Sequence, residues 1–395
     1  MIFKEAFRKD TAKWWLVWLV LHIVGIGFIL LRDAIHGRID GTIPYYEEGI
    51  TKVDGLSEYP PLNIWYLKFV HAISFGHFDV VFPLMIAVLS FFFSVFIIAR
   101  LDIEVAKWWM LIDGIMATLI AFRLDILVVI PVFFAFYCVY ISRNFWAGAF
   151  LMVATWAKVW PLVLYTALVS NIRDRRTWIH ASGAVAAGLV LTVATVLFNG
   201  LDALITPLTY QSDRGLQAES LWATPFYIMQ LFGDNWSTHY AESESFEILG
   251  PGADTVGVIA GYALNLFCVA AAIFAAYCLF TKKWTPLLSI RFATFVAFGI
   301  IAINKVFSPQ YLYWVVPMMI ILAAVDKSRD WSRILLALTI CAAVTMLIYP
   351  IDYESVTLMR PGMSVVLILR NFLVFGIFIA LIRALRESAA SESKS

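Results

Sequence analysis

The sequence predicts an all-α integral membrane protein with about twelve membrane segments, and three observations lead to that class. Of 395 residues, 62% are hydrophobic and only 14% are charged, more apolar than a soluble domain of this size. Apolar runs close to the roughly 20 residues that cross a bilayer recur along the whole chain. Lys and Arg gather in alternate connections between these runs. The net charge of +1 provides no general attraction for nucleic acid.

The apolar runs define the expected helices in order. They cover residues 14–32, 80–99, 106–122, 124–142, 145–171, 178–199, 257–281, 287–305, 310–325, 332–349 and 363–385. The first run is predicted to be a retained helix, since no small-residue cleavage site follows it. The run 145–171 carries Lys158 and Pro161 at its centre, so two half-length helices are expected there. Residues 60–76 suit a short helix at the membrane interface.

The distribution of Lys and Arg predicts the orientation. Basic residues mark the N-terminal segment, Arg143, 173–176, 282–283, 326–330 and the C-terminal tail, whereas the loop 200–256 has one Arg, no Lys and many carboxylates. Both termini are therefore expected in the cytoplasm, and the loops 33–59, 200–256 and 350–362 outside it. One membrane domain is predicted over residues 1–385, followed by a disordered cytoplasmic tail at 386–395.

The positions of the cysteines and histidines are not typical of a cofactor site. The four cysteines all fall inside apolar runs, and the six histidines are scattered without metal-ligand spacing. Neither a disulfide framework nor a metal site is expected.

The first outer segment, residues 32–65, is rich in carboxylates. A carboxylate at a helix mouth can act as a general base toward a sugar hydroxyl. For any single residue the alternative is a solvated acidic loop. The candidates are Asp33, Asp40, Glu47, Glu48, Asp54 and Glu58.

Two further outer segments carry groups that suit a phosphosugar. The planar guanidinium of Arg214 can donate two parallel hydrogen bonds to a phosphate, and the Gln217 side chain can reach sugar hydroxyls. The alternative is that Arg214 pairs with Asp213 or Glu219 in a structural loop. In "NKVFSPQYLYWVVP", a helix is expected to end at Lys305 and the chain to re-enter the membrane at Gln310. The alternative is that Lys305 only extends its ammonium to the membrane interface.

Ionisable residues also occur within or between the spans. Arg123 and Asp125 lie between two apolar runs and predict a tight outer turn that could line a cavity. Asp113 and Arg370 lie inside spans, where pairing with other buried groups is expected. Lys158, Lys305 and Arg214 at outer helix ends, with a carboxylate opposite, would suit a donor whose lipid chain lies in the bilayer and whose phosphate lies at the interface.

Five segments carry a family resemblance. "EYPPLNIWYL", "FRLDIL", "WAKVWPLVL", "RGLQAESLWATPF" and "FSPQYLYWVVP" occur in an order and at topological positions similar to those of glycosyltransferase family 87. The similarity covers about residues 14–325. This family belongs to the C-type (GT-C) integral-membrane glycosyltransferases, and its members include polyprenol-phosphate-mannose-dependent α-mannosyltransferases of the actinobacterial envelope.

The resemblance implies an inverting transfer, with an Asp of the first outer loop as the base. Asp40, five residues before Tyr45, fits best, and Asp33 is the alternative. The implied donor site comprises Arg214, Gln217, Glu219, Lys158, Lys305, Gln310 and Tyr311. The implied acceptor pocket comprises Tyr45, Tyr46, Glu58, Tyr59, Arg123, Asp125 and Trp222.

The expected function is transfer of mannose from polyprenyl-phosphate-mannose to a lipid-linked glycan or glycolipid on the extracytoplasmic face of the cell membrane. A polyprenyl-phosphate-arabinose donor remains an alternative within the same class. A lipid-sugar transporter or flippase is the alternative from another class. No cofactor and no nucleic-acid partner are expected.

Overall fold

The chain folds into helices that group in two compact units. The computed structural model describes residues 2–36, 41–52, 55–56, 59–169, 172–206, 214–233, 235–241, 245–281 and 284–392. Unit 1 comprises residues 1–165, 178–210 and 316–327, and unit 2 comprises residues 166–177, 211–315 and 328–395. The units alternate along the sequence, and each is described by itself below.

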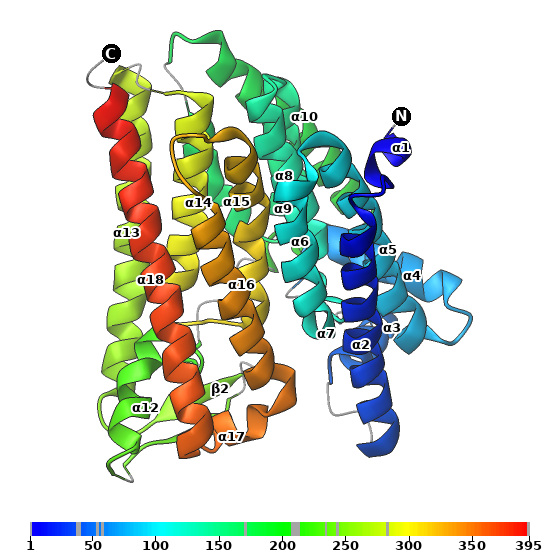
Figure 1. Cartoon of the computed structure of the whole chain (residues 1–395), viewed down its shortest axis with the longest axis vertical. Helices are drawn as coiled ribbons and strands as arrows, with labels where there is room; N and C mark the ends of the chain where they lie inside the picture. The colour runs from blue at the N-terminus through cyan, green and yellow to red at the C-terminus, as the bar shows by residue number, and fades with distance from the viewer. Residues whose placement is uncertain are drawn as a thin grey trace. The chain divides into compact units, whose positions relative to one another are not determined.

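Unit 1 is built from helices that pack pairwise (Figure 1). They are α1 (Ile2–Ala6), α2 (Ala12–His36), α3 (Thr42–Thr51), α4 (Pro61–Ile73), α5 (Phe78–Arg100), α6 (Ile103–Ile115), α7 (Ala117–Ile120), α8 (Ile126–Tyr140), α9 (Asn144–Ala157), most of η1 (Trp160–Leu168), most of α10 (Arg175–Asn199), η2 (Asp202–Leu204) and α15 (Val316–Val325). The pairs α8–α9 and α2–α6 make the most extensive contacts of the unit. Apolar side chains of α5, α6 and α8 fill its interior.

Two glycines bring α9 and α10 into backbone contact. A Cβ atom on Gly148 would lie 1.9 Å from the carbonyl oxygen of His180, and one on Gly183 would lie 1.9 Å from that of Phe145. Small residues allow such close approach between membrane helices. The Tyr165 hydroxyl donates to the Gly148 carbonyl at 3.0 Å and adds η1 to the same contact.

Unit 2 joins long helices to a short, irregular loop region. Its elements are η3 (Leu221–Ala223), α12 (Thr224–Gln230), β1 (Ser237–Tyr240), β2 (Phe246–Leu249), α13 (Ala253–Thr281), α14 (Pro286–Ile303), η4 (Pro309–Val315), α16 (Ser332–Met346), the π-helical η5 (Leu347–Ile351), α17 (Tyr353–Thr357) and α18 (Pro361–Glu392). Helix α18 packs on α12, α14 and α16. Strands β1 and β2 form an antiparallel hairpin in which Thr238 faces Ile248.

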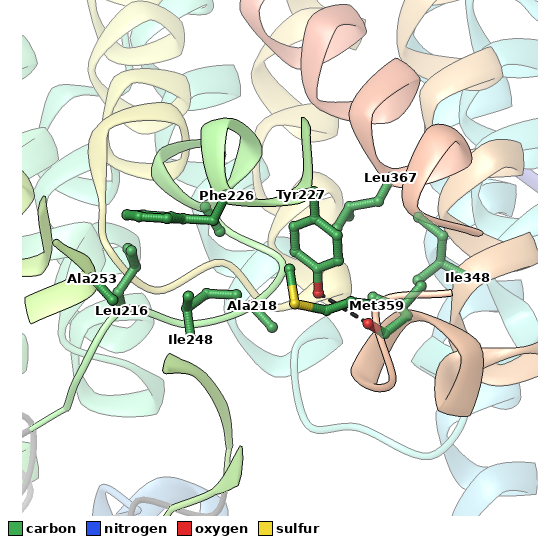
Figure 2. Close-up of a cluster of buried hydrophobic side chains, with 11 residues drawn as sticks. Leu216, Ala218, Phe226, Tyr227, Ile248, Ala253, Ile348, Met359 and Leu367 are labelled. Atoms are coloured by element: carbon green, nitrogen blue, oxygen red, sulfur yellow. Dashed lines mark hydrogen bonds between the residues drawn. The ribbon is translucent and has the colours of Figure 1, made fainter. Parts of the chain in front are cut away.

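A buried apolar cluster fastens the loop region to α18 (Figure 2). The Tyr227 ring lies at its centre, and the Tyr227 hydroxyl donates to the Val356 carbonyl at 3.1 Å. Its other members are Leu216, Ala218, Ala223, Phe226, Ile248, Ala253, Ile348, Val356, Met359 and Leu367. Burial of this apolar surface fixes the segment that carries Gln217 and Glu219.

The structure is that of an all-α multi-pass membrane protein. Among the described residues, seven helices are long and apolar enough to cross a membrane: Ala12–Ile35, Phe78–Arg100, Arg175–Asn199, Ala253–Thr281, Pro286–Ile303, Ser332–Ile351 and Pro361–Glu387. Ile126–Tyr140 and Pro309–Val325 are shorter apolar helices. The count of about twelve segments stays a prediction.

Three local features bear on the sequence-based expectations. The predicted break at Lys158 is confirmed, because α9 ends at Ala157 and Lys158 is extended. The β1–β2 hairpin was not predicted. Helix α18 runs on to Glu392 through residues expected as a disordered tail, and the ion pair between Arg329 and Glu387 at 3.1 Å lies in this stretch.

Candidate functional site

Three predicted donor-site residues of unit 2 meet at the C-terminal end of α14. Helix α14 ends at Ile303, Asn304 is extended, and Lys305 contacts the segment 214–217. The Lys305 ammonium donates to the Arg214 carbonyl, and the Gln217 backbone N–H donates to the Lys305 carbonyl at 3.1 Å. The Gln217 side-chain oxygen accepts from the Phe307 N–H at 2.7 Å. Hydrogen bonds thus join two segments that are about ninety residues apart in sequence.

The hairpin holds the same segment from another side. The Ala218 N–H donates to the Phe246 carbonyl at 2.8 Å, and the Ile248 N–H donates to the Leu216 carbonyl at 2.9 Å. The Glu247 carboxylate accepts from the Gly215 N–H at 2.9 Å. A Cβ atom on Gly215 would lie 2.2 Å from that carboxylate, so a larger residue there would require the Glu247 side chain to move.

Helix α18 supplies a buried cation to the segment. Arg370 is fully buried, and its Nη2 donates to the Glu219 carbonyl at 2.8 Å and lies 3.7 Å from the Glu219 carboxylate. Its guanidinium also lies 4.1 Å from the centre of the Phe307 ring, within cation–π distance. The neighbouring Asn371 amide donates to the Ser220 carbonyl at 3.2 Å.

Burial governs the protonation of Glu219. Burial raises the pKa of the Glu219 carboxyl to about 7, while the charge of Arg370 and a hydrogen bond from Tyr353 act in the opposite direction. Burial likewise raises the pKa of the Tyr353 hydroxyl well above its ordinary value. Glu219 can therefore change its charge near neutral pH.

Several polar atoms of this region have no hydrogen-bond partner. They are Arg214 Nε, Glu219 Oε2, Arg370 Nε and Nη1, Ser364 Oγ and Asn371 Oδ1. Leaving buried donors and acceptors unpaired costs about 1–3 kcal/mol each. We call Arg214, Gln217, Glu219, Lys305 and Arg370 the Arg214 cluster. It retains capacity to bind a polar ligand or water.

A second group of predicted residues meets within unit 1. Lys158 forms an ion pair with the buried Asp125 at 2.9 Å, and the Arg123 guanidinium donates to the Thr42 hydroxyl. The Asn63 amide donates at 2.7 Å to the carbonyl of Ala157, which the break in α9 leaves without a helical partner. This bond stabilises the break that presents Lys158 to Asp125.

Two of the predicted tyrosines, Tyr46 and Tyr59, belong to the same group. The Tyr46 hydroxyl lies 3.4 Å from that of Tyr59, and burial raises the pKa of Tyr46 well above its ordinary value. The charges of Arg123 and Asp125 also act on Tyr46. We call Thr42, Tyr46, Tyr59, Arg123, Asp125 and Lys158 the Lys158 cluster. Tyr45 packs its ring 6.2 Å from that of Tyr46.

The remaining predicted residues have varied positions. Asp33 lies at the end of α2 and pairs with Arg32 at 3.3 Å. Asp40 and Glu58 lie outside the described residues. Tyr311 in η4 stacks on Trp314 with 3.9 Å between ring centres, and Gln310 precedes it.

Trp222, which the family resemblance implies for the acceptor pocket, makes a structural contact. Its indole N–H donates to the Ile303 carbonyl at 2.7 Å and thereby caps α14. Arg370, Asn371 and Tyr353 are the site residues that were not assigned from the sequence. The only signal was the charge of Arg370 inside an apolar run, which predicts a buried partner without identifying it.

The comparisons with known proteins add no further assignment. No family model, no curated protein and no solved structure matches the chain. Across the part of the chain that the structure describes, no group of three or more His, Cys, Asp or Glu could hold a metal ion.

Proposed function

We propose that the chain is an inverting membrane glycosyltransferase that uses a polyprenyl-phosphate sugar. Mannose is the first candidate for the transferred sugar, and a lipid-linked glycan or glycolipid is the acceptor. The main support is the convergence of Arg214, Gln217 and Lys305, three residues that the family resemblance implies for the donor site, at the end of one apolar helix.

The chemistry of the Arg214 cluster suits a phosphate at a membrane interface. Arg214 is half-buried and its Nε has no partner, so the guanidinium keeps donors for phosphate oxygens. Lys305 adds a second positive charge beside it. Cations that stabilise the departing phosphate promote its loss from the anomeric carbon.

Each cluster, taken within its own unit, lies at helix ends opposite to the basic connections. In unit 1, α8 runs toward Arg143 and α9 returns to Lys158; in unit 2, α14 starts after Lys282 and Lys283 and ends before Lys305. By the distribution of positive charge, both clusters belong to the extracytoplasmic side. A lipid donor would reach them with its chain in the bilayer.

The acceptor hydroxyl needs a base because a neutral hydroxyl is a weak nucleophile. Asp40 is the proposed base, with Asp33 as its alternative. A positioned carboxylate contributes roughly 10²–10⁴-fold to the rate. The Asp33 carboxylate is engaged by Arg32, which favours Asp40.

Purified protein in liposomes tests this function directly. The protein is given radiolabelled polyprenyl-phosphate-mannose or polyprenyl-phosphate-arabinose with a glycolipid acceptor, and released lipid phosphate is measured with product. We expect turnover with the mannose donor and a loss of at least about 100-fold in Asp40→Asn. Asp33→Asn is the matched control and should retain more activity. Movement of labelled lipid across the bilayer without product would instead support a flippase.

Orientation is tested separately in intact cells. Ser237 lies in the exposed hairpin and Arg333 lies at the start of α16 on the predicted cytoplasmic side. Cysteine at Ser237 should react with an impermeant thiol reagent, and cysteine at Arg333 should not. The reverse pattern would contradict the proposed side of the membrane.

A further inference from the structure

The residues that precede α2 form a folded segment of unit 1. Its helix α1 packs on α5 and lies at the N-terminal end of α2 (Figure 1). The Thr11 hydroxyl donates to the Ala6 carbonyl at 2.9 Å, and the Trp15 indole N–H donates to the same carbonyl at 2.8 Å. These bonds occupy a carbonyl at the end of α1 and hold that end against the first turn of α2.

Two phenylalanines of this segment are half exposed. The Phe7 N–H donates to the Phe3 carbonyl at 3.1 Å, so the two residues lie one helical turn apart, and their rings stack with 6.3 Å between centres. The Phe7 ring also stacks on Trp15 at 5.0 Å, yet the Phe3 and Phe7 side chains remain 55% and 50% exposed. An apolar surface where a membrane helix begins is typical of contact with lipid.

The same segment carries an excess of positive charge. Its remaining cation, beside three lysines, is Arg8, which pairs with Glu5 at 3.3 Å and with Asp10 at 3.2 Å. The exposed lysines form no ion pair among the residues that the structure describes, and they are Lys4, Lys9 and Lys13. Their charges are therefore available to an anion beside the two phenylalanines.

We propose that residues 3–13 bind the headgroup of an anionic phospholipid, in the leaflet that the N-terminal end of α2 enters. The lysine ammonium groups bind the lipid phosphate, and Phe3 and Phe7 contact the glycerol backbone and the first carbons of the acyl chains. Each basic residue beside a membrane helix strengthens the attraction to an anionic surface by about fivefold. This inference is independent of the proposed transferase function.

An effect on the direction of membrane insertion does not by itself explain the folded segment. Positive charge that only directs insertion requires neither a helix nor aromatic side chains. Burial of the segment among acyl chains is also unfavourable, because its basic side chains would lose their hydration. The headgroup region of an anionic leaflet suits the lysines and the phenylalanines together.

Lipid titration of the purified full chain, followed by native mass spectrometry, tests the proposal. Phosphatidylglycerol supplies the anionic headgroup, and phosphatidylcholine with the same acyl chains is the matched zwitterionic lipid. We expect phosphatidylglycerol to bind at least about 10-fold more tightly. This preference should decrease as salt is raised from about 0.1 M. Equal affinity of the wild-type chain for the two lipids would overturn the proposal.

Charge substitutions locate the site. The combined variant Lys4→Gln, Lys9→Gln and Lys13→Gln should reduce the preference for phosphatidylglycerol to about 3-fold or less. The matched control removes three exposed positive charges elsewhere, through Arg175→Gln, Lys327→Gln and Arg333→Gln, and should keep the wild-type preference. An equal loss in the two variants, or a loss in neither, would overturn the assignment to residues 3–13.

A variant with stronger binding guards against failed insertion of the lysine variant. Glu5→Gln with Asp10→Asn removes two exposed carboxylates and releases Arg8, so phosphatidylglycerol should bind more tightly than to the wild type. Unchanged affinity would contradict the proposal. Excess glycerol phosphate should not displace the lipid, because it lacks the acyl chains that Phe3 and Phe7 contact. Displacement would show a phosphate site that does not recognise lipid.

Discussion

The Lys158 cluster and the Arg214 cluster differ in what their charged side chains bind. In the first, Lys158 binds the Asp125 carboxylate, and Arg123 donates to the Thr42 hydroxyl and, at 3.2 Å, to the carbonyl of the adjacent Phe122. In the second, Lys305 and Arg370 donate to backbone carbonyls, and polar side-chain atoms stay without partners. Cations that hold the backbone fix a loop while part of their hydrogen-bonding capacity stays available. The Arg214 cluster is therefore the better place for a charged ligand.

Removal of the buried Arg370 charge should lower the free energy of unfolding more than any of the substitutions that follow. Arg370→Met leaves the Glu219 carboxyl buried without its counter-ion and the Glu219 carbonyl without its donor. We expect the free energy of unfolding to fall by about 3–5 kcal/mol. Unfolding in detergent measures this, with the exposed Arg333→Met as control. Equal effects of the two substitutions would show that Arg370 does not hold the loop.

The charge of Glu219 should make stability depend on pH. Its pKa is raised to about 7 in the folded protein from an ordinary value of 4.5. Between these values the folded chain binds more protons than the unfolded chain. The free energy of unfolding should therefore fall as pH rises from 4.5 to 7, by at most about 1.4 kcal/mol per pH unit, and then level off.

Glu219→Gln supplies the control for this pH dependence. The substitution keeps the shape of the side chain and removes its ionisation. Unfolding at several pH values should show a flatter profile than in the wild type. Identical profiles would exclude Glu219 as the group responsible.

Arg214 should affect donor use more than stability. We expect Arg214→Ala to lower kcat/KM for the donor by about 30-fold, which corresponds to about 2 kcal/mol. Arg214→Lys should recover only part of the lost kcat/KM because an ammonium cannot donate two parallel hydrogen bonds to phosphate as a guanidinium does. Arg360→Ala removes an exposed arginine of the same unit and should be near wild type. A folded Arg214→Ala protein with unchanged kinetics would argue for a structural role.

Removal of the ion pair in the Lys158 cluster should lower the free energy of unfolding less than Arg370→Met does. Lys158→Met removes the ion pair with Asp125, but the Lys158 side chain is 29% exposed, so solvent reduces the loss. We expect a decrease of about 1–2 kcal/mol in the free energy of unfolding. Lys52→Met, in the exposed pair with Glu48, should leave the free energy of unfolding almost unchanged because solvent screens the pair. A loss as large as that of Arg370→Met would contradict the contrast between the clusters.

Helix positions were predictable because single features of the sequence determine them. The charge of Lys158 in the middle of an apolar run predicted the break in α9, and the apolar run that begins at Gln310 predicted a new helical segment there. The end of α18 was predicted too early. Its residues from Arg386 onward are polar, but alanine, arginine and glutamate favour helix.

The contacts of the site were harder to predict because they join distant segments. The proximity of Arg214 and Lys305 followed from the family resemblance, whereas the partner of Arg370 is 151 residues away and no local pattern identifies it. The hairpin strands are four residues each and carry too little alternation to separate them from loop. Asp40 and Glu58, outside the described residues, remain predictions.

The close contact between α9 and α10 limits which mutations the chain can accept. At Gly148 and Gly183 even a single methyl group would overlap a carbonyl oxygen of the facing helix. In a saturation library, these two positions should tolerate fewer replacements than the lipid-facing positions Leu189 and Val193 of α10. Selection would therefore preserve two glycines for their packing alone, because they set the position of helix α9, which ends at Ala157 just before Lys158.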